Sequence, residues 1–153
     1  MANESMTLRA PSHDVVLSIE GKISNTNANT EPRADFDLAM LMAMPPLTIE
    51  TSTPWTEGVV RFEGVAVKDV LDRVAPTGHE GEFVALNDYT VRIPLENFSQ
   101  MNAIIAYRMN GKPMSVRDKG PLWVIYPLDT IKPAQSDLYR DRMVWQLRTI
   151  IVK

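Results

Sequence analysis

LTIETSTPWTEGVVRF, residues 47–62, carries the clearest strand and loop pattern in the sequence. Leu47-Thr-Ile-Glu-Thr51 alternates apolar and polar residues and is rich in β-branched side chains, which predicts a strand. Ser52–Gly58 contains a proline and ends on a glycine, which predicts a loop. Val59–Phe62 predicts a second short strand. The stretch therefore predicts two strands joined by an exposed loop.

The rest of the chain continues in short elements. A helix is predicted over Val67–Val74, because its apolar residues recur at the i, i+3, i+4, i+7 spacing of an amphipathic helix. Asp35 is a candidate N-cap for a second helix. The further expected elements are strands at 15–19, 83–86, 89–93, 103–109, 122–126 and 143–152, a helix at 36–44 and a helical turn at 94–98. Many short strands with a few short helices predict an α+β domain built on a mixed β-sheet.

Length and composition predict one domain of ordinary size. The chain has 153 residues, of which 44% are hydrophobic and 23% charged, both near globular averages. Residues 1–13 are polar and predict a flexible N-terminal arm, and residues 14–153 predict a single domain. The net charge of −3 shows no basic excess, so a nucleic-acid partner is not expected. No apolar run approaches the length of a membrane span, so membrane insertion is not expected either.

Familiar catalytic motifs are missing from the sequence. It contains no cysteine, which excludes thiolate nucleophiles and cysteine–metal sites. The two histidines, His13 and His79, show no metal-ligand spacing. No Gly-x-Ser-x-Gly elbow, Gly-Lys-Ser/Thr phosphate loop or Gly-x-Gly-x-x-Gly motif occurs. On motifs alone, the sequence indicates no enzyme class.

Three polar patches are candidates for a binding site, although each alone is also compatible with an ordinary turn. They are the hydroxyl and aromatic residues after the strand at 47–51, a polar hairpin tip at 87–89, and a cationic turn at 117–121. Loops at one end of a sheet tend to converge, so the patches are expected to line one pocket. The candidate residues are Thr51, Ser52, Trp55, Asp88, Tyr89, Arg117 and Lys119.

At these patches the chain resembles the molybdopterin-binding domain of the sulfite oxidase family. The resemblance runs from about Val15 to Val152. It rests on 47–51, Trp55, 62–65, Val70-Leu71, 88–95, 110–113, 119–122, Tyr126-Pro127 and 144–147, in that order. It implies a mixed α+β fold. For the site, it implies that Arg117 and Lys119 lie near an anionic pterin phosphate, that Asp88 and Tyr89 border the pocket, and that Trp55 forms an apolar wall.

The chain also departs from the pattern of that family. The family's enzymes hold molybdenum through a cysteine that follows this strand, and Thr51 stands in its place. A threonine hydroxyl is a hard, protonated and weak ligand, whereas a thiolate is soft and charged. An upstream segment rich in Arg and His is missing, and Trp123 follows Gly-Pro-Leu where an arginine is frequent in the family. No protein metal ligand is expected here.

Three hypotheses for the function follow. The first is a small stand-alone, non-catalytic member of the family that binds a small anionic ligand or a partner protein, with no cofactor expected. The second is a molybdopterin-dependent oxidoreductase in which the pterin dithiolene alone holds the metal. The third is a ligand-free sensor or structural subunit. Met1–Met6 lacks the features of a signal peptide. If a native signal was trimmed before Met6, the resemblance implies export to a bacterial periplasm.

Overall fold

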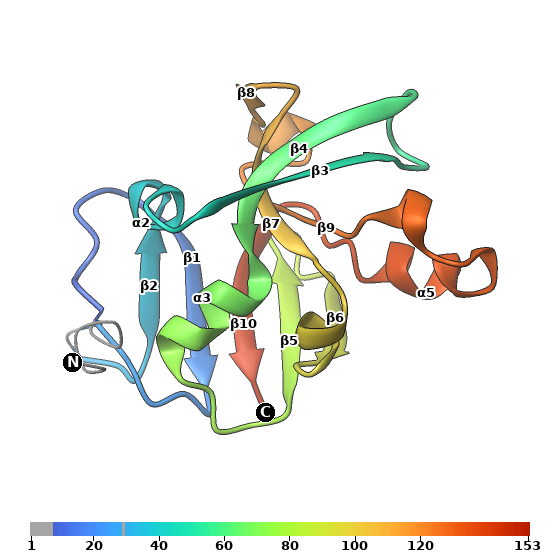
Figure 1. Cartoon of the computed structure of the whole chain (residues 1–153). Coiled ribbons are helices and arrows are strands. Elements are labelled where there is room, and N and C mark those ends of the chain that lie inside the picture. Colours follow the sequence, from blue (N-terminus) through green and yellow to red (C-terminus); the bar gives the residue numbers. More distant parts are fainter. Residues whose placement is uncertain (1–7, 29) are drawn as a thin grey trace.

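The computed structural model describes residues 8–28 and 30–153. Within these residues the strands form two sheets (Figure 1). The first sheet has the order β2-β1-β10-β5-β6. Its strands are β1 (Val15–Gly21), β2 (Ala34–Asp37), β5 (Glu80–Ala85), β6 (Thr90–Pro94) and β10 (Leu147–Val152). β1 and β10 pair in parallel, and the other neighbours in this sheet pair antiparallel.

The second sheet is antiparallel and has the order β3-β4-β7-β8, with β9 also paired to β7. Its strands are β3 (Pro46–Ser52), β4 (Val59–Ala66), β7 (Ile104–Met109), β8 (Lys112–Pro113) and β9 (Trp123–Ile125). β3 and β4 pair along their length, from Pro46 opposite Val65 to Ser52 opposite Val59. This hairpin confirms the two strands predicted in residues 47–62, although β4 is longer than expected. It extends from the body of the molecule in Figure 1.

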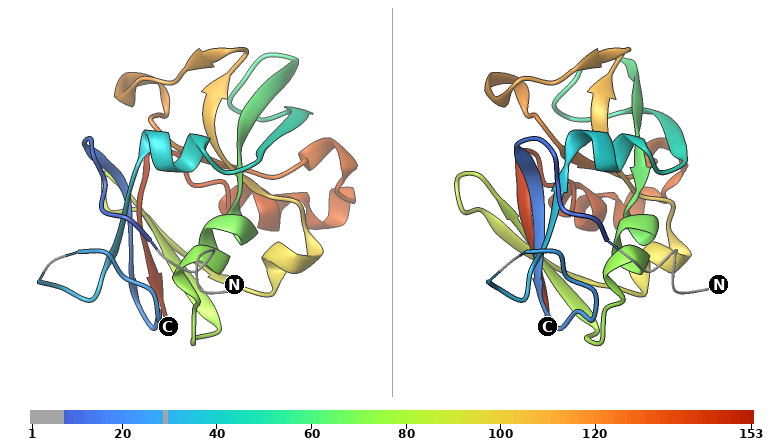
Figure 2. Two further views of the ribbon diagram at one scale, coloured as in Figure 1. Left: turned by 60° about the vertical axis from the view of Figure 1, so that its left-hand side comes forward. Right: turned by 90° about the vertical axis from the view of Figure 1, so that its left-hand side faces the viewer.

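Short helices connect the strands. The α-helices are α2 (Leu38–Met42), α3 (Val67–Val74), α4 (Asn97–Gln100) and α5 (Ser136–Asp141), and the 3-10 helices are η1 (Val116–Asp118), η2 (Leu128–Thr130) and η3 (Pro133–Gln135). α2 and α3 lie on the side of the first sheet that faces the second sheet (Figure 2). None of the helices in the described ranges has the length and apolarity to span a membrane.

One hydrophobic core joins the two sheets. α3 has the boundaries predicted from the sequence, and its expected apolar face of Val67, Val70, Leu71 and Val74 is buried. This face belongs to the same buried cluster as β-strand side chains from both sheets, such as the fully buried Ile19, Phe62 and Ile150. The predicted α+β class is confirmed, with one mixed sheet, one antiparallel sheet and a few short helices.

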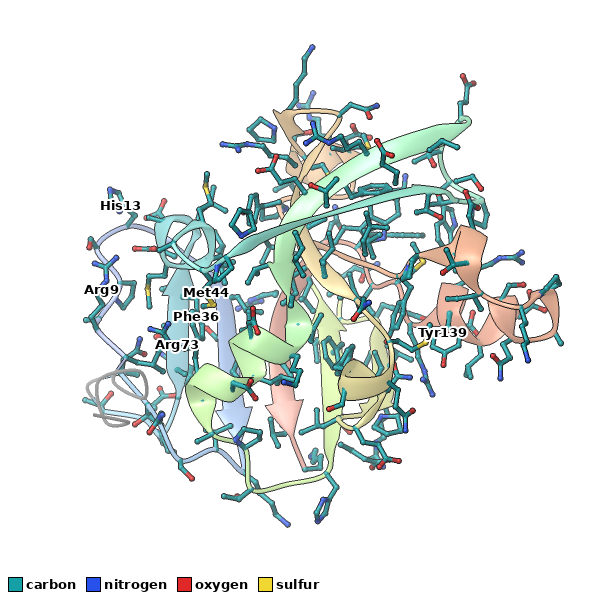
Figure 3. The ribbon with its side chains drawn as sticks, viewed as in Figure 1. Arg9, His13, Phe36, Met44, Arg73 and Tyr139 are labelled. Atoms are coloured by element: carbon teal, nitrogen blue, oxygen red, sulfur yellow. The ribbon has the colours of Figure 1, made fainter. Side chains whose placement is uncertain are left out.

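The helix predicted over residues 36–44 is wrong at its start. Residues 34–37 form β2, which pairs with β1, and only Leu38–Met42 are helical. The N-cap is Asp37 and not Asp35, because the Asp37 carboxylate accepts a hydrogen bond of 2.8 Å from the Met40 amide. Phe36 is fully buried opposite Leu17, and Figure 3 shows it at the same end of the molecule as Met44. The apolar run therefore serves a strand and a helix in succession.

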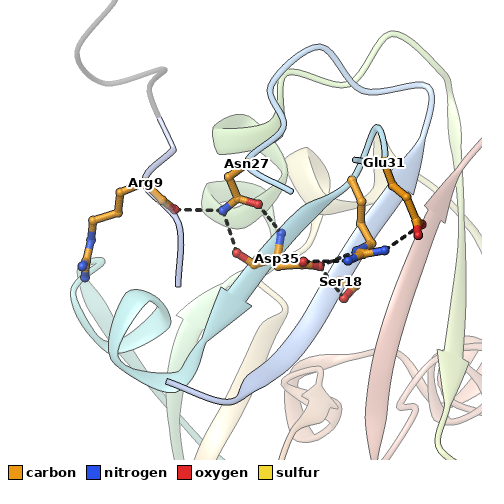
Figure 4. Close-up of polar contacts among 6 residues, drawn as sticks. Arg9, Ser18, Asn27, Glu31 and Asp35 are labelled. Atoms are coloured by element: carbon orange, nitrogen blue, oxygen red, sulfur yellow. Dashed lines mark hydrogen bonds and ion pairs between the residues drawn. The ribbon is translucent and has the colours of Figure 1, made fainter. Parts of the chain in front are cut away.

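Asp35 holds the loop before β2 instead of capping a helix. Its carboxylate accepts hydrogen bonds from Arg33 Nε at 2.7 Å and from the Ser18 hydroxyl at 2.7 Å. The Asn27 side chain accepts from the Asp35 amide and donates to its carbonyl (Figure 4). The pKa of Asp35 is lowered, first because Arg33 donates to the carboxylate. These contacts explain why the backbone stays extended at this residue.

Two smaller elements also differ from expectation. The helical turn predicted at 94–98 is α4, which begins three residues later, because Pro94 still belongs to β6. α5 was not predicted, since Tyr139 is its only buried residue and no apolar period marks it. The flexibility expected for residues 1–13 stays a prediction. Residues 1–7 lie outside the described ranges, and the Ser12 and His13 amides donate to the Asp37 carboxylate at 2.9 and 3.1 Å.

Ala75 offers a test of the end of α3. It has a left-handed backbone with φ of 49° at the C-cap, where glycine is favoured. Ala75→Gly should raise the free energy of unfolding by about 0.5–1 kcal/mol, since relief of the left-handed strain exceeds the added chain entropy. Ala39→Gly, at an exposed helical position in α2, should lower it by about 0.5–1 kcal/mol. Urea denaturation measures both, and a loss of stability in Ala75→Gly would contradict the assignment.

Asp37 should make stability sensitive to acid. Its pKa is lowered, chiefly because the Met40 amide donates to the carboxylate, with the Ser12 and His13 amides adding. The stabilisation is therefore complete above the unfolded pKa of about 3.9 and is lost as the pH falls through the lower folded pKa. Asp37→Asn should reduce the free energy of unfolding at pH 7 by about 2 kcal/mol. Urea titrations between neutral and acid pH should show a smaller loss with acid in this variant, and an unchanged loss would refute the role.

Candidate functional site

Thr51 lies at the end of β3 and is fully buried. Its hydroxyl donates a hydrogen bond of 3.0 Å to the Ser52 carbonyl and accepts one of 3.1 Å from the Asp129 amide. A hydroxyl has one donor and is satisfied by such a pair of contacts when buried. Thr51 is thus engaged within the protein on both its donor and its acceptor side.

Ser52 and Asp129 form a second link between β3 and η2. The Ser52 amide donates to the Asp129 carboxylate at 2.9 Å, and the Ser52 hydroxyl donates to the other carboxylate oxygen. The Ser52 hydroxyl is the main cause of a lowered pKa at Asp129, followed by the Ser52 amide. We name the contacts among Thr51, Ser52 and Asp129 the Asp129 clamp. It joins two segments that are 77 residues apart in sequence.

Beyond the clamp lies a cluster of three tryptophans, Trp55, Trp123 and Trp145. Their rings meet edge to face, with centroids 5.2 Å apart for Trp55 and Trp145 and 6.2 Å apart for Trp55 and Trp123. Trp123 is fully buried, and its indole N–H donates to the Met143 carbonyl at 3.2 Å. Trp55 and Trp145 are only partly buried. The cluster therefore has a closed side and an open side.

Lys119 brings positive charge to this cluster. Its ammonium nitrogen lies 5.4 Å from the ring centroid of Trp145 and 5.9 Å from that of Trp123, within the range of cation–π attraction. Lys119 has a left-handed backbone with φ of 74°, and its carbonyl accepts a hydrogen bond from the Gln146 amide. The neighbouring Arg117 lies on η1 and is exposed. Of the two predicted cations, only Lys119 contacts the tryptophans.

The open side of the cluster borders a cavity of about 260 Å³. Trp55 and Trp145 form part of the wall, and Tyr89 comes from the tip of the β5–β6 hairpin. The other lining residues are Ala85, Asn87, Arg140, Asp141, Met143 and Val144. The Tyr89 hydroxyl donates to the Asp141 carbonyl at 3.4 Å and so reaches from the hairpin to α5. Residues far apart in sequence thus build one concave site.

α5 is held in place from inside the protein by a buried polar chain. The Tyr126 hydroxyl donates to the Asn97 side-chain carbonyl at 2.7 Å, and the Asn97 amide donates to the Tyr139 hydroxyl at 3.3 Å. Burial raises the pKa of Tyr126, so it stays a neutral donor. Figure 3 shows Tyr139 on α5, on the other side of the molecule from His13. The wall that carries Arg140 and Asp141 is therefore anchored.

The structure brings together part of the predicted site. Trp55 and Tyr89 line the cavity, and Lys119 contacts the tryptophans beside it. Thr51 and Ser52 lie in the Asp129 clamp. Asp88 and Arg117 are exposed and outside the lining residues. Asp88 takes a left-handed turn conformation with φ of 70° directly before Tyr89.

Sequence reasoning missed the wall formed by residues 140–145. Arg140 and Asp141 belong to α5, for which no periodic signal exists. Trp145 was assigned to a strand, although β10 begins only at Leu147. A single usable signal was the aromatic residue in Val144-Trp-Gln-Leu147, which formed part of the family resemblance.

The residues present do not fit a molybdenum ion held by a side chain. Thr51 is protonated, buried and hydrogen-bonded on both sides, so its hydroxyl offers no free ligand position. In the described ranges, no group of three or more His, Cys, Asp or Glu residues is placed to hold a metal ion. Hard, neutral hydroxyls are poor substitutes for a soft thiolate.

Comparison with solved structures gives a clear fold relative. The sulfane dehydrogenase SoxCD from Paracoccus pantotrophus superposes with a TM-score of 0.63 and 16% sequence identity. The match covers 89% of this chain but 37% of that chain, so this chain spans about a third of the length of its structural relative. At this identity the likeness shows the fold. A comparison with curated protein sequences gives no significant match.

Comparison with protein families identifies the domain. The profile described as oxidoreductase molybdopterin binding domain matches residues 16–130. The matched range includes β1 to η2, and thus Thr51, Trp55, Tyr89 and Lys119, but ends before Arg140 and Trp145. It covers well over half of the chain. The chain therefore belongs to the oxidoreductase molybdopterin binding domain family, the molybdopterin-binding domain of the sulfite oxidase family.

Proposed function

We propose that this domain is a non-catalytic member of its family that binds a small anionic ligand in the cavity beside Trp55 and Trp145. The proposal depends on Thr51, which replaces the family's cysteine. Its hydroxyl already donates to the Ser52 carbonyl and accepts from the Asp129 amide. A site without a protein thiolate lacks the soft, charged ligand that holds molybdenum. We assign the binding function to the cavity lined by Trp55 and Trp145.

The charges near the cavity support an anionic ligand. Arg140 and Asp141 both line it and offset each other, while Lys119 adds a positive charge over the Trp145 ring. Within the described ranges, the ion-pair partner of Arg140 is Asp137, whose side chain is 92% exposed. Such exposed pairs contribute about 0–1 kcal/mol, so the guanidinium is readily available to another carboxylate or phosphate.

Three of the five non-glycine residues with a left-handed backbone in the described ranges lie around the same cavity, while Ala75 and Asn110 lie outside it. Asp88, Lys119 and Gln146 have φ of 70°, 74° and 51°, and each is next to or in contact with a residue of the cavity wall. A left-handed backbone is unfavourable for side chains other than glycine and is found preferentially at binding and active sites. This clustering supports a functional role for the cavity rather than a chance gap between loops.

Two other functions have an observation in their favour. Membership of the family favours a molybdopterin-dependent oxidoreductase in which the pterin dithiolene alone holds the metal. Exposed apolar side chains near the cavity favour a partner protein as the occupant, because Leu86, Tyr89 and Leu138 are 40%, 51% and 48% exposed. Because Thr51 stands in place of the cysteine and its hydroxyl is already hydrogen-bonded, we rank the oxidoreductase below the non-catalytic proposal.

Native mass spectrometry tests the loss of metal chemistry. The protein should be produced in a host that synthesises molybdopterin, together with Thr51→Cys. The wild-type protein should show no added mass of a molybdenum–pterin. Thr51→Cys should show none either, because Asp129 still holds the loop. Ser99→Cys, an exposed thiol on α4, is the control for adventitious metal. A molybdenum–pterin on the wild-type protein would overturn the non-catalytic assignment.

Lys119 and Arg117 provide a matched pair for anion binding. Inorganic phosphate and benzoate serve as probes in thermal-shift titrations, where a ligand at 100 times its dissociation constant stabilises by about 2.7 kcal/mol. Lys119→Ala should weaken binding of the effective probe by about three- to tenfold, as expected for the loss of one nearby cation. Arg117→Ala should leave it unchanged, since Arg117 is exposed and, within the described ranges, makes no cation–π contact with the tryptophans, whereas Lys119 does. Equal effects of the two variants would argue against the cavity as the site.

A further inference from the structure

The cavity wall is aromatic on more than one side. Trp55 and Trp145 meet edge to face with an interplanar angle of 77°, and Tyr89 contributes a third ring from the hairpin tip. Edge-to-face and offset contacts between rings add about 0.5–1.5 kcal/mol to the energy of area burial. A planar aromatic ring is therefore a favourable occupant.

Several hydrogen-bond donors on this wall have no partner within the described ranges. Neither the Trp55 nor the Trp145 indole N–H donates to a residue within the described ranges, in contrast to Trp123. Neither is a buried unsatisfied donor, so both remain open to solvent. The Asn87 side-chain carbonyl accepts from the Tyr89 amide at 3.1 Å, which leaves the Asn87 NH₂ as a further donor.

Charge adds to this excess of donors. Arg140 supplies a guanidinium whose partner Asp137 is exposed, and Lys119 lies on the tryptophan rings. The Asp141 carboxylate is the opposing negative group in the lining. Two indole donors, an amide donor and a guanidinium against one carboxylate favour a ligand that carries acceptor oxygens.

The volume limits the size of the ligand. About 260 Å³ lies below the range of roughly 300–1,000 Å³ of pockets that bind drug-sized molecules. One aromatic ring with one acidic group suits this space. Inorganic phosphate would use the donors but leave the aromatic walls without a partner.

We propose that the cavity binds a small aromatic carboxylate, with the ring against Trp55 and Trp145 and the carboxylate on Arg140. The proposal rests on the proposed function, since it names the class of the anion that the same cavity takes. The indole N–H groups and the Asn87 amide complete the recognition of the carboxylate oxygens.

NMR of the indole N–H groups tests the proposal with four probes. Benzoate has an aromatic ring and a negative charge, whereas benzamide has the aromatic ring without the charge. Cyclohexanecarboxylate has the negative charge on a saturated ring, and inorganic phosphate has negative charge and no ring. Benzoate should shift the Trp55 and Trp145 indole signals and bind most tightly. The Trp123 signal is the internal control, because its N–H is bonded to Met143. Trp55→Phe and Trp145→Phe assign the signals.

Arg140→Gln separates the charge from the ring. It should weaken benzoate binding about tenfold, as expected for the loss of a charge-assisted contact, and leave benzamide binding unchanged. Arg61→Gln, an exposed arginine on β4 outside the cavity lining, should behave like the wild-type protein. The change at Arg140 lies on an exposed helix position, so folding of the variant is not at risk.

Several outcomes would overturn the proposal. Phosphate or cyclohexanecarboxylate binding as tightly as benzoate would show that the aromatic ring is not recognised, while the proposed anion-binding function would stand. Failure of all four probes to shift the Trp55 and Trp145 signals would also refute it. A molybdenum–pterin found by native mass spectrometry would instead refute the proposed function.

Discussion

The pairing of β10 between β1 and β5 is the constraint on which the rest of the structure depends. β10 is the last strand of the chain, yet it lies at the centre of the first sheet, parallel to β1 and antiparallel to β5. The segment before β10 carries Trp145, and the hairpin after β5 carries Tyr89. The Leu86 amide donates to the Gln146 carbonyl at 2.9 Å where these segments meet. The strand register therefore brings the two sides of the cavity together.

The Asp129 clamp explains how a member of this family keeps its loop in place without a metal–thiolate bond. The Thr51 hydroxyl accepts a hydrogen bond from the Asp129 amide. The Ser52 hydroxyl and the Ser52 amide both donate to the Asp129 carboxylate. Such contacts depend on hydrogen-bond geometry and on a carboxylate that stays ionised, not on a soft ligand. Since a buried hydroxyl that is already bonded gains nothing by approaching a metal, the fold and the metal site are separable properties in this chain.

Local pattern was sufficient for much of the fold. The strand at 47–51 and the helix at 67–74 follow from periodicity, because the helix buries its whole apolar face and the strand buries Ile49 and Thr51 on one side. The apolar run that begins at Phe36 was wrongly predicted to be helical from its start, because such a run is compatible with either a buried strand or a buried helix. The pairing of residues 34–37 with β1 makes its first part a strand. The candidate site was harder to predict from the sequence than the fold. Trp55 and Tyr89 lie in loops that the sequence predicts. In contrast, α5 has one buried residue, Tyr139, and is positioned by a hydrogen bond from Asn97, which is far away in sequence.

The polarity of the cavity depends on which hydrogen-bonding groups of its lining residues are already bonded within the protein. Partly buried aromatic rings supply shape, and two backbone carbonyls of the wall are already used, since Asp141 accepts from Tyr89 and Met143 from Trp123. What remains unused is mainly donors, on Trp55, Trp145, Asn87 and Arg140, beside a lysine held over the rings by a left-handed backbone. A wall of this kind offers aromatic surface to a flat ring and hydrogen-bond donors to acceptor oxygens. This combination is the reason for proposing a flat molecule with negatively charged oxygens as the ligand of the cavity.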